Sequence, residues 1–184
     1  MTNIRATEQK LEIRREVRRR ISAMDSETKE AAALEIFSRI EHLPHFRDAR
    51  CIALFAAMKD EVPTHDALRR WSDMGKRIVV PRVEGDIMHF YDYTPEAMCE
   101  GAFGIDEPTG DERCSAGDID LMIVPARAFT ISGVRLGRGG GFYDKYMSLP
   151  DFRAHKTGIA FACQIFDSLP FDAHDITVDE VVFA

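Results

Sequence analysis

The chain has 184 residues, with 24 lysines and arginines against 31 aspartates and glutamates, so its formal net charge is −7. An acidic chain opposes nucleic-acid binding, which depends on neutralising many phosphates, and no apolar run approaches the roughly 18 residues that a membrane helix needs. The four cysteines are far apart and the N-terminal segment lacks the apolar core of a secretory signal, so a cytoplasmic protein with reduced thiols is expected.

The first part of the chain predicts two helices. Apolar residues recur at helical spacing between positions 13 and 24, which predicts a helix from about 8 to 23 with Thr7 available as its N-cap. A second helix is expected between Ser26 and Pro44, because Ala33 and Phe37 begin another apolar face.

The remainder of the chain predicts strands with helices between them. Thr64 is expected to cap a helix that Gly75 ends, and a further helix is expected to begin at the FYDKYMSL segment. The stretch from 94 to 117 is expected to be mostly loop. Short apolar or alternating runs predict strands at residues 51–57, 76–81, 87–93, 120–125, 157–162 and 178–184.

This order of elements predicts an α/β fold. Several strands are apolar throughout, which is typical of parallel strands covered on both faces. We therefore expect one domain over residues 1–184, with a mostly parallel central sheet flanked by helices on both faces in Rossmann-like layers. Such sheets bind ligands at the carboxyl ends of their strands, where the KDE and RLGRGGG segments are expected to lie.

The segment RLGRGGGFYD, residues 135–144, is the main candidate binding site. Its glycines can turn several backbone N–H groups toward one anion, and a following helix adds its N-terminal dipole. Arg135 and Arg138 add positive charge suited to phosphate oxygens. The segment is neither a Walker A sequence nor a dinucleotide GxGxxG motif, because Phe142 occupies the last glycine position. A glycine-rich surface turn is the alternative interpretation.

Other charged residues allow two readings each. Asp144 can bind Mg²⁺ beside a phosphate site or cap a helix, and Asp175 can bind the same metal ion or be an ordinary loop acid. Glu61 can hydrogen-bond a ligand ring or cap a turn. A basic stripe formed by Lys10, Arg14 and Arg18 is either functional or a solvated helix face. No side chain is arranged as a covalent nucleophile.

Eight segments in order resemble one known family, the 5-formyltetrahydrofolate cyclo-ligases. They are KLEIR, IALFAAMKDEVPT, IVVPRV, GIDEP, DLMIVPARAF, GVRLGRGGGFYDKY, GIAFACQ and LPFDAHDITVDEVV. The resemblance covers nearly the whole chain, and its glycine segment is the most specific part. It implies an ATP- and Mg²⁺-dependent ligase that converts 5-formyltetrahydrofolate to 5,10-methenyltetrahydrofolate and releases ADP and phosphate. ATP is then a co-substrate, the partners are small molecules, and a monomer is expected.

The resemblance also implies roles for individual residues. Arg138 and Lys10 become catalytic candidates, and Asp144 and Asp175 become magnesium ligands. The implied nucleotide contacts are Lys10, Leu11, Glu12, Ile13, Arg14, Arg135, Leu136, Gly137, Arg138, Gly139, Gly140, Gly141, Phe142 and Tyr143. The implied folate contacts are Ala56, Glu61, Arg138, Gly139, Gly140, Gly141 and Phe142.

The chain departs from the family pattern at two positions. Phe142 stands where tyrosine is common, and Arg127 falls in a stretch that often reads PGVAF; neither is expected to touch the phosphate chemistry. Two other functions stay open: a divergent relative that acts on another folate or on none, and a non-catalytic module that senses nucleotides or associates with RNA.

Overall fold

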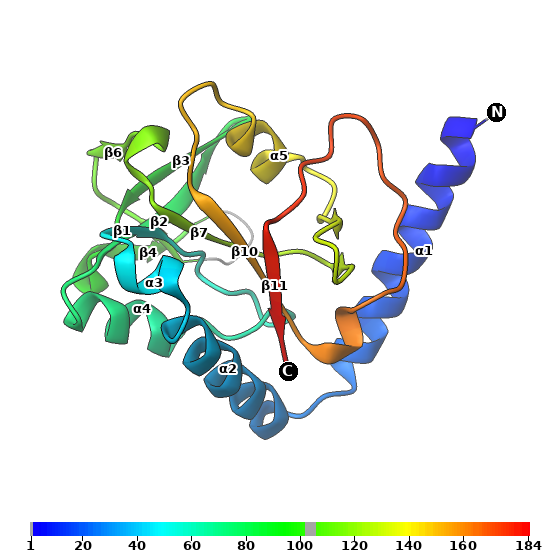
Figure 1. The fold of residues 1–184 in the computed structure, drawn as a ribbon, viewed down its shortest axis with the longest axis horizontal. Helices are drawn as coiled ribbons and strands as arrows, with labels where there is room; N and C mark the ends of the chain where they lie inside the picture. The colour runs from blue at the N-terminus through cyan, green and yellow to red at the C-terminus, as the bar shows by residue number, and fades with distance from the viewer. Residues whose placement is uncertain (1, 102–105) are drawn as a thin grey trace.

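The computed structural model describes residues 2–101 and 106–184, with side chains from Ala6 onward (Figure 1). The helices are α1 (Thr2–Ser22), α2 (Ser26–Glu41), α3 (Pro44–Asp48), α4 (His65–Asp73) and α5 (Phe142–Met147), with short 3-10 turns at Pro95–Ala97, Ala116–Asp118 and Ala162–Gln164. The strands are β1 (Cys51–Ala53), β2 (Arg77–Glu84), β3 (Ile87–Asp92), β4 (Met98–Glu100), β5 (Asp106–Pro108), β6 (Arg113–Cys114), β7 (Leu121–Val124), β8 (Ala128–Phe129), β9 (Arg135–Leu136), β10 (His155–Ala160) and β11 (Glu180–Phe183).

Seven strands form the central sheet in the order β11-β10-β7-β1-β2-β3-β6. The pairings from β11 to β2 are parallel, whereas β3 and β6 join antiparallel at one side. The pairs β4-β5 and β8-β9 form two small antiparallel sheets. The mostly parallel sheet predicted from the apolar strands is therefore confirmed.

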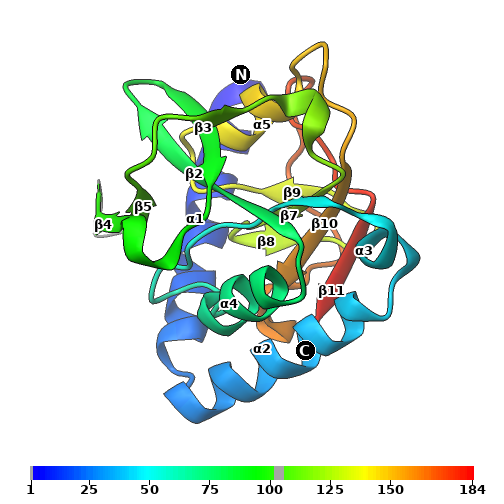
Figure 2. The same cartoon turned by 90° about the vertical axis from the view of Figure 1, so that its left-hand side faces the viewer.

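Helices cover both faces of this sheet (Figures 1 and 2). One face packs against α1, α2 and α4, which contribute Ile21, Phe37 and the fully buried Trp71 to one apolar core. The other face packs against α5, whose Tyr146 and Met147 are buried in a second core. The predicted helical layers are confirmed. No helix in the described part of the chain is long and apolar enough to cross a membrane.

Some predicted element boundaries need correction. The first helix already begins at Thr2, so Thr7 lies inside it rather than capping it. The second helix is capped by Asp25, whose Oδ1 accepts a hydrogen bond from the backbone N–H of Thr28 at 2.7 Å. The strand predicted over 51–57 is only three residues long, although the N–H of Leu54 still donates to the carbonyl of Val79 in β2 at 3.0 Å.

Thr64 fixes the loop that follows β1. It precedes α4 as predicted, but its side chain makes no capping bond. Instead the Thr64 hydroxyl donates to the carbonyl of Phe55 at 2.7 Å and accepts from the N–H of Ala57 at 3.0 Å. This double contact fixes the chain at the carboxyl end of β1, just before Glu61.

Candidate functional site

The glycine segment, residues 135–144, begins inside a short hairpin of β8 and β9 that the sequence did not predict, because its first two residues, Arg135 and Leu136, form β9. The hairpin follows β7, so the segment is not attached directly to the strand as expected. Gly139 and Gly141 have φ angles of 116° and 68°, which side chains rarely adopt. Among the described contacts, the backbone N–H groups of residues 137–141 donate no hydrogen bond. These N–H groups remain available to a ligand.

The turn of this hairpin meets the C-terminal part of the chain. Gly133 has a φ of 90°, and a Cβ added there would lie 2.2 Å from the backbone oxygen of Val178. The N–H of Val178 donates to the carbonyl of Gly133 at 2.9 Å. This close backbone approach fixes the segment carrying Asp175 relative to β9.

Arg135 is a buried cation with unused hydrogen-bonding capacity. Its side chain is 3% exposed, and its Nη2 lies 2.6 Å from Oδ1 of Asp144. The ion pair is poorly aligned for hydrogen bonding, so Nε and Nη2 are buried without a hydrogen-bond partner among the described residues. Because such groups are costly to leave unsatisfied, this guanidinium is suited to an incoming anion.

Helix α1 presents Lys10 and Arg14 on one face, as expected from their four-residue spacing, toward residues 172–175 and the glycine segment. The Lys10 ammonium donates to Asp172 at 2.6 Å and to Asp175 at 2.9 Å, and Arg14 Nε donates to the carbonyl of Gly137 at 2.9 Å. Figure 1 shows the loop before β11 running beside α1. Within the basic stripe of α1, Lys10 and Arg14 therefore contact other parts of the chain and are not simply a solvated helix face.

The charges around α1 shift the pKa of both basic groups. Partial burial alone would lower the pKa of Lys10, but its bonds to Asp172 and Asp175 outweigh burial and raise it. Burial lowers the pKa of Arg14; Asp175 partly offsets this effect, whereas the positive charge of Arg127 adds to it. The guanidinium groups of Arg14 and Arg127 are therefore close enough to repel each other.

The other α1 candidates make no described contact with the glycine segment. Leu11 is 46% exposed and Glu12 is exposed. Glu12 and Ile13 line an open groove toward Phe166, and Ile13 also packs against the core. Arg18 is exposed as well. Nucleotide contacts from Leu11, Glu12 and Ile13 stay predictions.

Arg138 joins the glycine segment to the loop after β1. Its Nε lies 2.9 Å from Oε1 of Glu61, and its Nη2 lies 2.6 Å from Oδ1 of Asp60. Glu61 also accepts a hydrogen bond from the N–H of Met58 at 2.9 Å, and Ala56 is half-buried nearby in sequence. The predicted nucleotide and folate segments are thus in direct contact through one arginine.

Asp144 and Asp175, the predicted metal ligands, belong to neighbouring segments. Oδ1 of Asp144 accepts a hydrogen bond from the N–H of Ile176 at 2.9 Å. Burial alone would raise the pKa of Asp175, but bonds from the backbone of Asp172 and from Lys10 outweigh it and lower the pKa. Across residues 2–101 and 106–184, no three histidine, cysteine or acidic side chains converge as a metal site. Two carboxylates nevertheless fit Mg²⁺, which takes one or two together with phosphate oxygens and water.

Two aromatic residues follow the glycines. Phe142 lies against Gly140, where an added Cβ would be 2.7 Å from the ring. The Arg135 guanidinium lies 6.0 Å from the centroid of the Tyr143 ring, and burial raises the pKa of Tyr143. Helix α5 begins at Phe142 as predicted but has only six residues.

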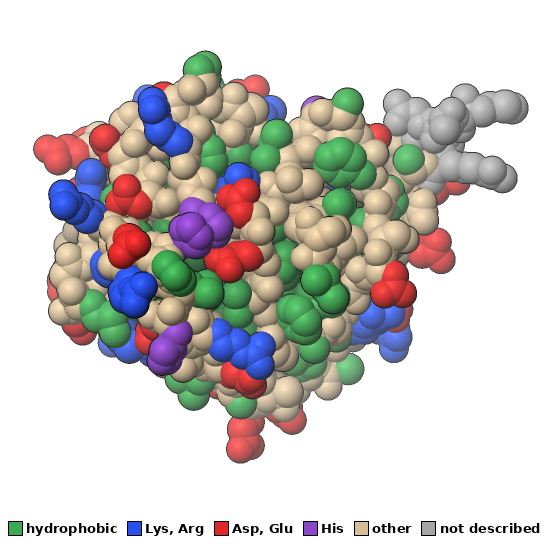
Figure 3. Space-filling model, viewed as in Figure 1, with side chains coloured by type: hydrophobic (Ala, Val, Ile, Leu, Met, Phe, Trp, Pro, Cys, Tyr) green, Lys and Arg blue, Asp and Glu red, His purple; other side chains and the backbone are tan. Residues whose placement is uncertain are grey.

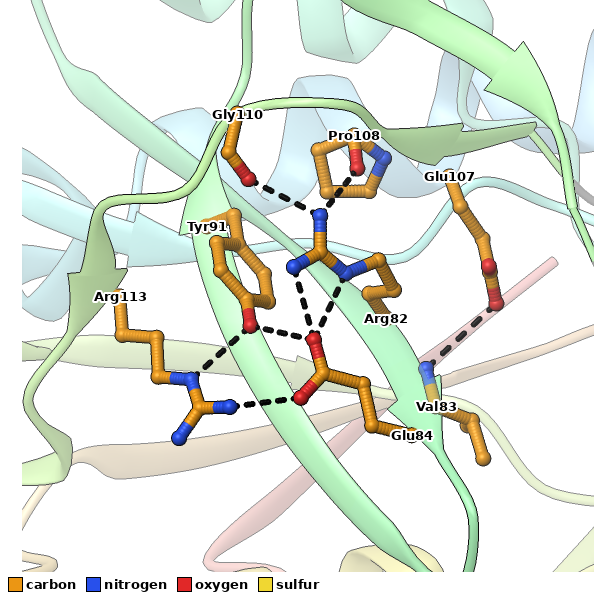
Figure 4. Close-up of polar contacts among 8 residues, drawn as sticks. All are labelled: Arg82, Val83, Glu84, Tyr91, Glu107, Pro108, Gly110 and Arg113. Carbon is orange, nitrogen blue, oxygen red and sulfur yellow. Dashed lines mark hydrogen bonds and ion pairs between the residues drawn. The ribbon is translucent and has the colours of Figure 1, made fainter.

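A second polar network lies on β2 and β3 (Figure 4). Glu84 accepts hydrogen bonds from Arg82, Tyr91 and Arg113, and Arg82 also donates to the carbonyls of Pro108 and Gly110. These bonds attach residues 108–113 to the sheet. The GIDEP motif runs into this region, but its Gly104 and Ile105 lie outside the described residues.

Three charged residues of the candidate site were not predicted from the sequence. Asp60 and Asp172 bind the predicted Arg138 and Lys10, and Arg127 binds Asp60. Asp60 stands in the KDE segment beside Glu61, which was the available signal. The expectation that Arg127 does not touch the phosphate chemistry stays a prediction, although the Asp60 carboxylate links this arginine to Arg138.

The parallel sheet, the glycine segment and the basic side chains around it define an α/β protein with a candidate site for a small anionic ligand. The sequence model of the 5-formyltetrahydrofolate cyclo-ligase family matches residues 6–184. The chain therefore belongs to this enzyme family.

Individual relatives agree with this assignment. The 5-formyltetrahydrofolate cyclo-ligase of Escherichia coli K12 is 30% identical over 176 residues, covering 90% of this chain and 95% of that protein. The mouse (Mus musculus) enzyme of the same name is 29% identical and covers 93% of this chain and 91% of its own. The NMR structure of 5,10-methenyltetrahydrofolate synthetase from Aquifex aeolicus matches with a TM-score of 0.85 and 33% identity, covering 95% of this chain and 89% of that one.

Proposed function

We propose that this protein uses ATP to convert 5-formyltetrahydrofolate to 5,10-methenyltetrahydrofolate, releasing ADP and phosphate. Family membership supports the reaction. The nucleotide half rests on the glycine segment, which carries Arg135 and Arg138, is contacted by Arg14, and has amides at residues 137–141 that donate no described hydrogen bond. Lys10 binds Asp172 and Asp175 in the loop next to it. A triphosphate is the ligand that this number of cations suits best.

The chemistry requires a better leaving group. The oxygen of a formamide departs with difficulty, whereas the same oxygen carrying the γ-phosphoryl group of ATP departs as phosphate. The neighbouring bridge nitrogen of the folate then attacks the activated carbon, which closes the ring. Each step joins two substrate atoms, so no protein nucleophile is needed, in agreement with the sequence.

Phosphoryl transfer asks the protein mainly for positioning and charge compensation. In this proposal the amides of residues 137–141, Arg135 and Arg14 hold the triphosphate, while Lys10 and Arg138 compensate the charge on the transferred group. Mg²⁺ on Asp144 and Asp175 supplies further charge neutralisation when bound. Glu61 orients the polar edge of the folate ring.

Lys10 and Arg138 have to exchange partners for this to happen. Both are paired with carboxylates in the described structure. Phosphate oxygens offer them equivalent charge-assisted bonds, so binding replaces one set of ion pairs by another rather than stripping a bare cation of water. The acids thereby keep the basic groups oriented before the nucleotide binds.

The test mixes purified protein with ATP, Mg²⁺ and 5-formyltetrahydrofolate and follows the near-ultraviolet absorbance of the methenyl product. Arg138→Ala should lose about 2–4 kcal/mol of transition-state stabilisation, as for one preorganised donor, which is on the order of 10²-fold in kcat/KM. The control is Arg153→Ala, an exposed arginine before the amino end of β10, which should retain normal turnover.

The outcome separates the remaining functions. Near-normal turnover of Arg138→Ala would refute its role. A flat trace from wild-type protein that still binds ATP by calorimetry would favour a relative acting on another substrate. Binding of RNA in place of ATP would favour the non-catalytic module, although basic and acidic side chains are interspersed on the face shown in Figure 3.

A further inference from the structure

Arg127 is a buried charge that the proposed reaction does not use. It follows β7, is 5% exposed as a residue, and has a side chain that is 6% exposed. Its Nη1 donates to Oδ2 of Asp60 at 2.5 Å. Arginine is rarely buried to this degree unless it is paired, so its environment calls for an explanation beyond surface solubility.

The backbone around Arg127 holds it rigidly beside the glycine segment. Its N–H donates to the carbonyl of Leu136, the residue before Gly137, at 2.7 Å. Its carbonyl accepts from Nε2 of Gln164 at 3.1 Å, and Gln164 is itself 2% exposed. These contacts fix the backbone of Arg127, from which its side chain reaches Asp60.

Asp60 connects this fixed arginine to Arg138. One of its carboxylate oxygens binds Arg127, and the other lies 2.6 Å from Nη2 of Arg138. Burial alone would raise the pKa of Asp60, but hydrogen bonds from Arg138 and Arg127 outweigh burial and lower the pKa. The carboxylate is therefore ionised at neutral pH and bridges two cations.

Arg138 depends on this bridge for its orientation. Its Nε is held by Glu61 and its Nη2 is shared between Glu61 and Asp60, while Nη1 takes part in no described hydrogen bond or ion pair. The side chain is 33% exposed. Without a fixed Asp60, one of the two anchors of the guanidinium becomes mobile.

We propose that Arg127 and Asp60 form a positioning pair for the reaction, in which the buried Arg127 fixes Asp60 and Asp60 orients Arg138 toward the nucleotide phosphates. The inference rests on the proposed function in that it takes Arg138 as the group that meets phosphate. Arg127 itself touches neither substrate. Its effect on the reaction passes mainly through Arg138, while its positive charge also acts on Arg14.

The experiment is a double-mutant cycle on the full-length protein. Arg127→Gln, Arg127→Lys and Asp60→Asn are each made in the wild type and in Arg138→Ala. For every variant, kcat is taken from methenyl formation and the Kd for ATP–Mg²⁺ from calorimetry. Thermal unfolding reports any loss of folding stability separately.

Arg127→Gln should lower kcat about tenfold in the wild type, because small misplacements of an oriented group are costly. It should also weaken ATP binding several-fold. In the Arg138→Ala background the same change should alter either quantity by less than about twofold, since coupled residues are non-additive. Asp60→Asn should repeat this pattern, and Arg127→Lys, which retains the charge, should recover part of the loss.

Equal losses in both backgrounds would overturn the proposal, because Arg127 would then act independently of Arg138. So would wild-type kcat and Kd in Arg127→Gln. If that variant fails to fold, Asp60→Asn carries the same comparison. A wild type that makes no methenyl product but shows the coupling in its ATP affinity would sink the proposed function and leave this inference standing. An active wild type without coupling would do the reverse.

Discussion

Gly133→Ala tests the contact that positions the C-terminal half of the site. The wild-type φ of 90° is unfavourable for alanine, and left-handed backbone costs an L-residue about 1–2 kcal/mol. The new Cβ would lie 2.2 Å from the oxygen of Val178. That atom is backbone and cannot rotate away, so overpacking of this kind adds about 1–3 kcal/mol.

The separation forced by the methyl group also strains the Val178–Gly133 hydrogen bond, which is worth about 1 kcal/mol. The total expected loss is about 3–6 kcal/mol in the free energy of unfolding. It is reduced by up to about 1 kcal/mol because alanine has less backbone entropy in the unfolded chain. Turnover should fall as well, because a displacement of Val178 also shifts Asp175 and Ile176, which lie just before it in the chain.

Urea unfolding followed by circular dichroism measures this difference, and Gly85→Ala is the matched control. Gly85 also has a positive φ, of 66°, but an added Cβ would meet no atom within 4 Å. The Gly85→Ala variant should lose only the part of the unfolding free energy that comes from backbone strain, about 1 kcal/mol. If both variants lose the same amount, the close approach to Val178 contributes nothing and the reasoning is refuted.

Three further expectations concern single groups. The Tyr146 hydroxyl is buried without a hydrogen-bond partner among the described residues, so Tyr146→Phe should raise the thermal midpoint slightly or leave it unchanged; a fall would reveal a missing partner. Asp60 and Asp175 have pKa values lowered by folding, so their stabilisation is present above the unfolded value near 3.9 and is lost as the pH falls through the folded values. Urea midpoints should therefore decrease from pH 5 to 3, and Asp175→Asn should flatten that decrease; an unchanged slope counts against the assignment. Gly140→Ala would force the Phe142 ring to move, so its kcat/KM should fall while its unfolding free energy changes little, and intact kinetics would show that the ring position is unimportant.

The sheet could be predicted because buried parallel strands leave apolar runs that local sequence records. The hairpin of β8 and β9 could not, since each strand has two residues and no periodicity can be read from so few. Thr7 and Thr64 show the limit at helix ends. Each has the chemistry of a cap, but the first lies inside a helix that starts earlier and the second bonds to the loop after β1.

The site residues also fall into those that local sequence could identify and those that it could not. Residues 135–144 could be selected from their unusual composition, and the α1 pair from its spacing. Their ionic partners could not, because Lys10 contacts Asp172 across 162 positions and Arg127 contacts Asp60 across 67. Local patterns contain no information about such pairings, which arise only when the strands take their order in the sheet. From the sequence, Arg127 could therefore be identified only as a departure from the family pattern, with no role assigned to it.

The bond between Lys10 and Asp175 has a consequence for how the protein is made. During translation the chain is extended by about 5–20 residues per second, so helix α1 is synthesised several seconds before the carboxylate partners of Lys10. Lys10 lacks both of the carboxylates that orient it until Asp172 and Asp175 have been made. Chains truncated before residue 172 should therefore have low affinity for nucleotide, although every strand of the central sheet except β11 lies before that point.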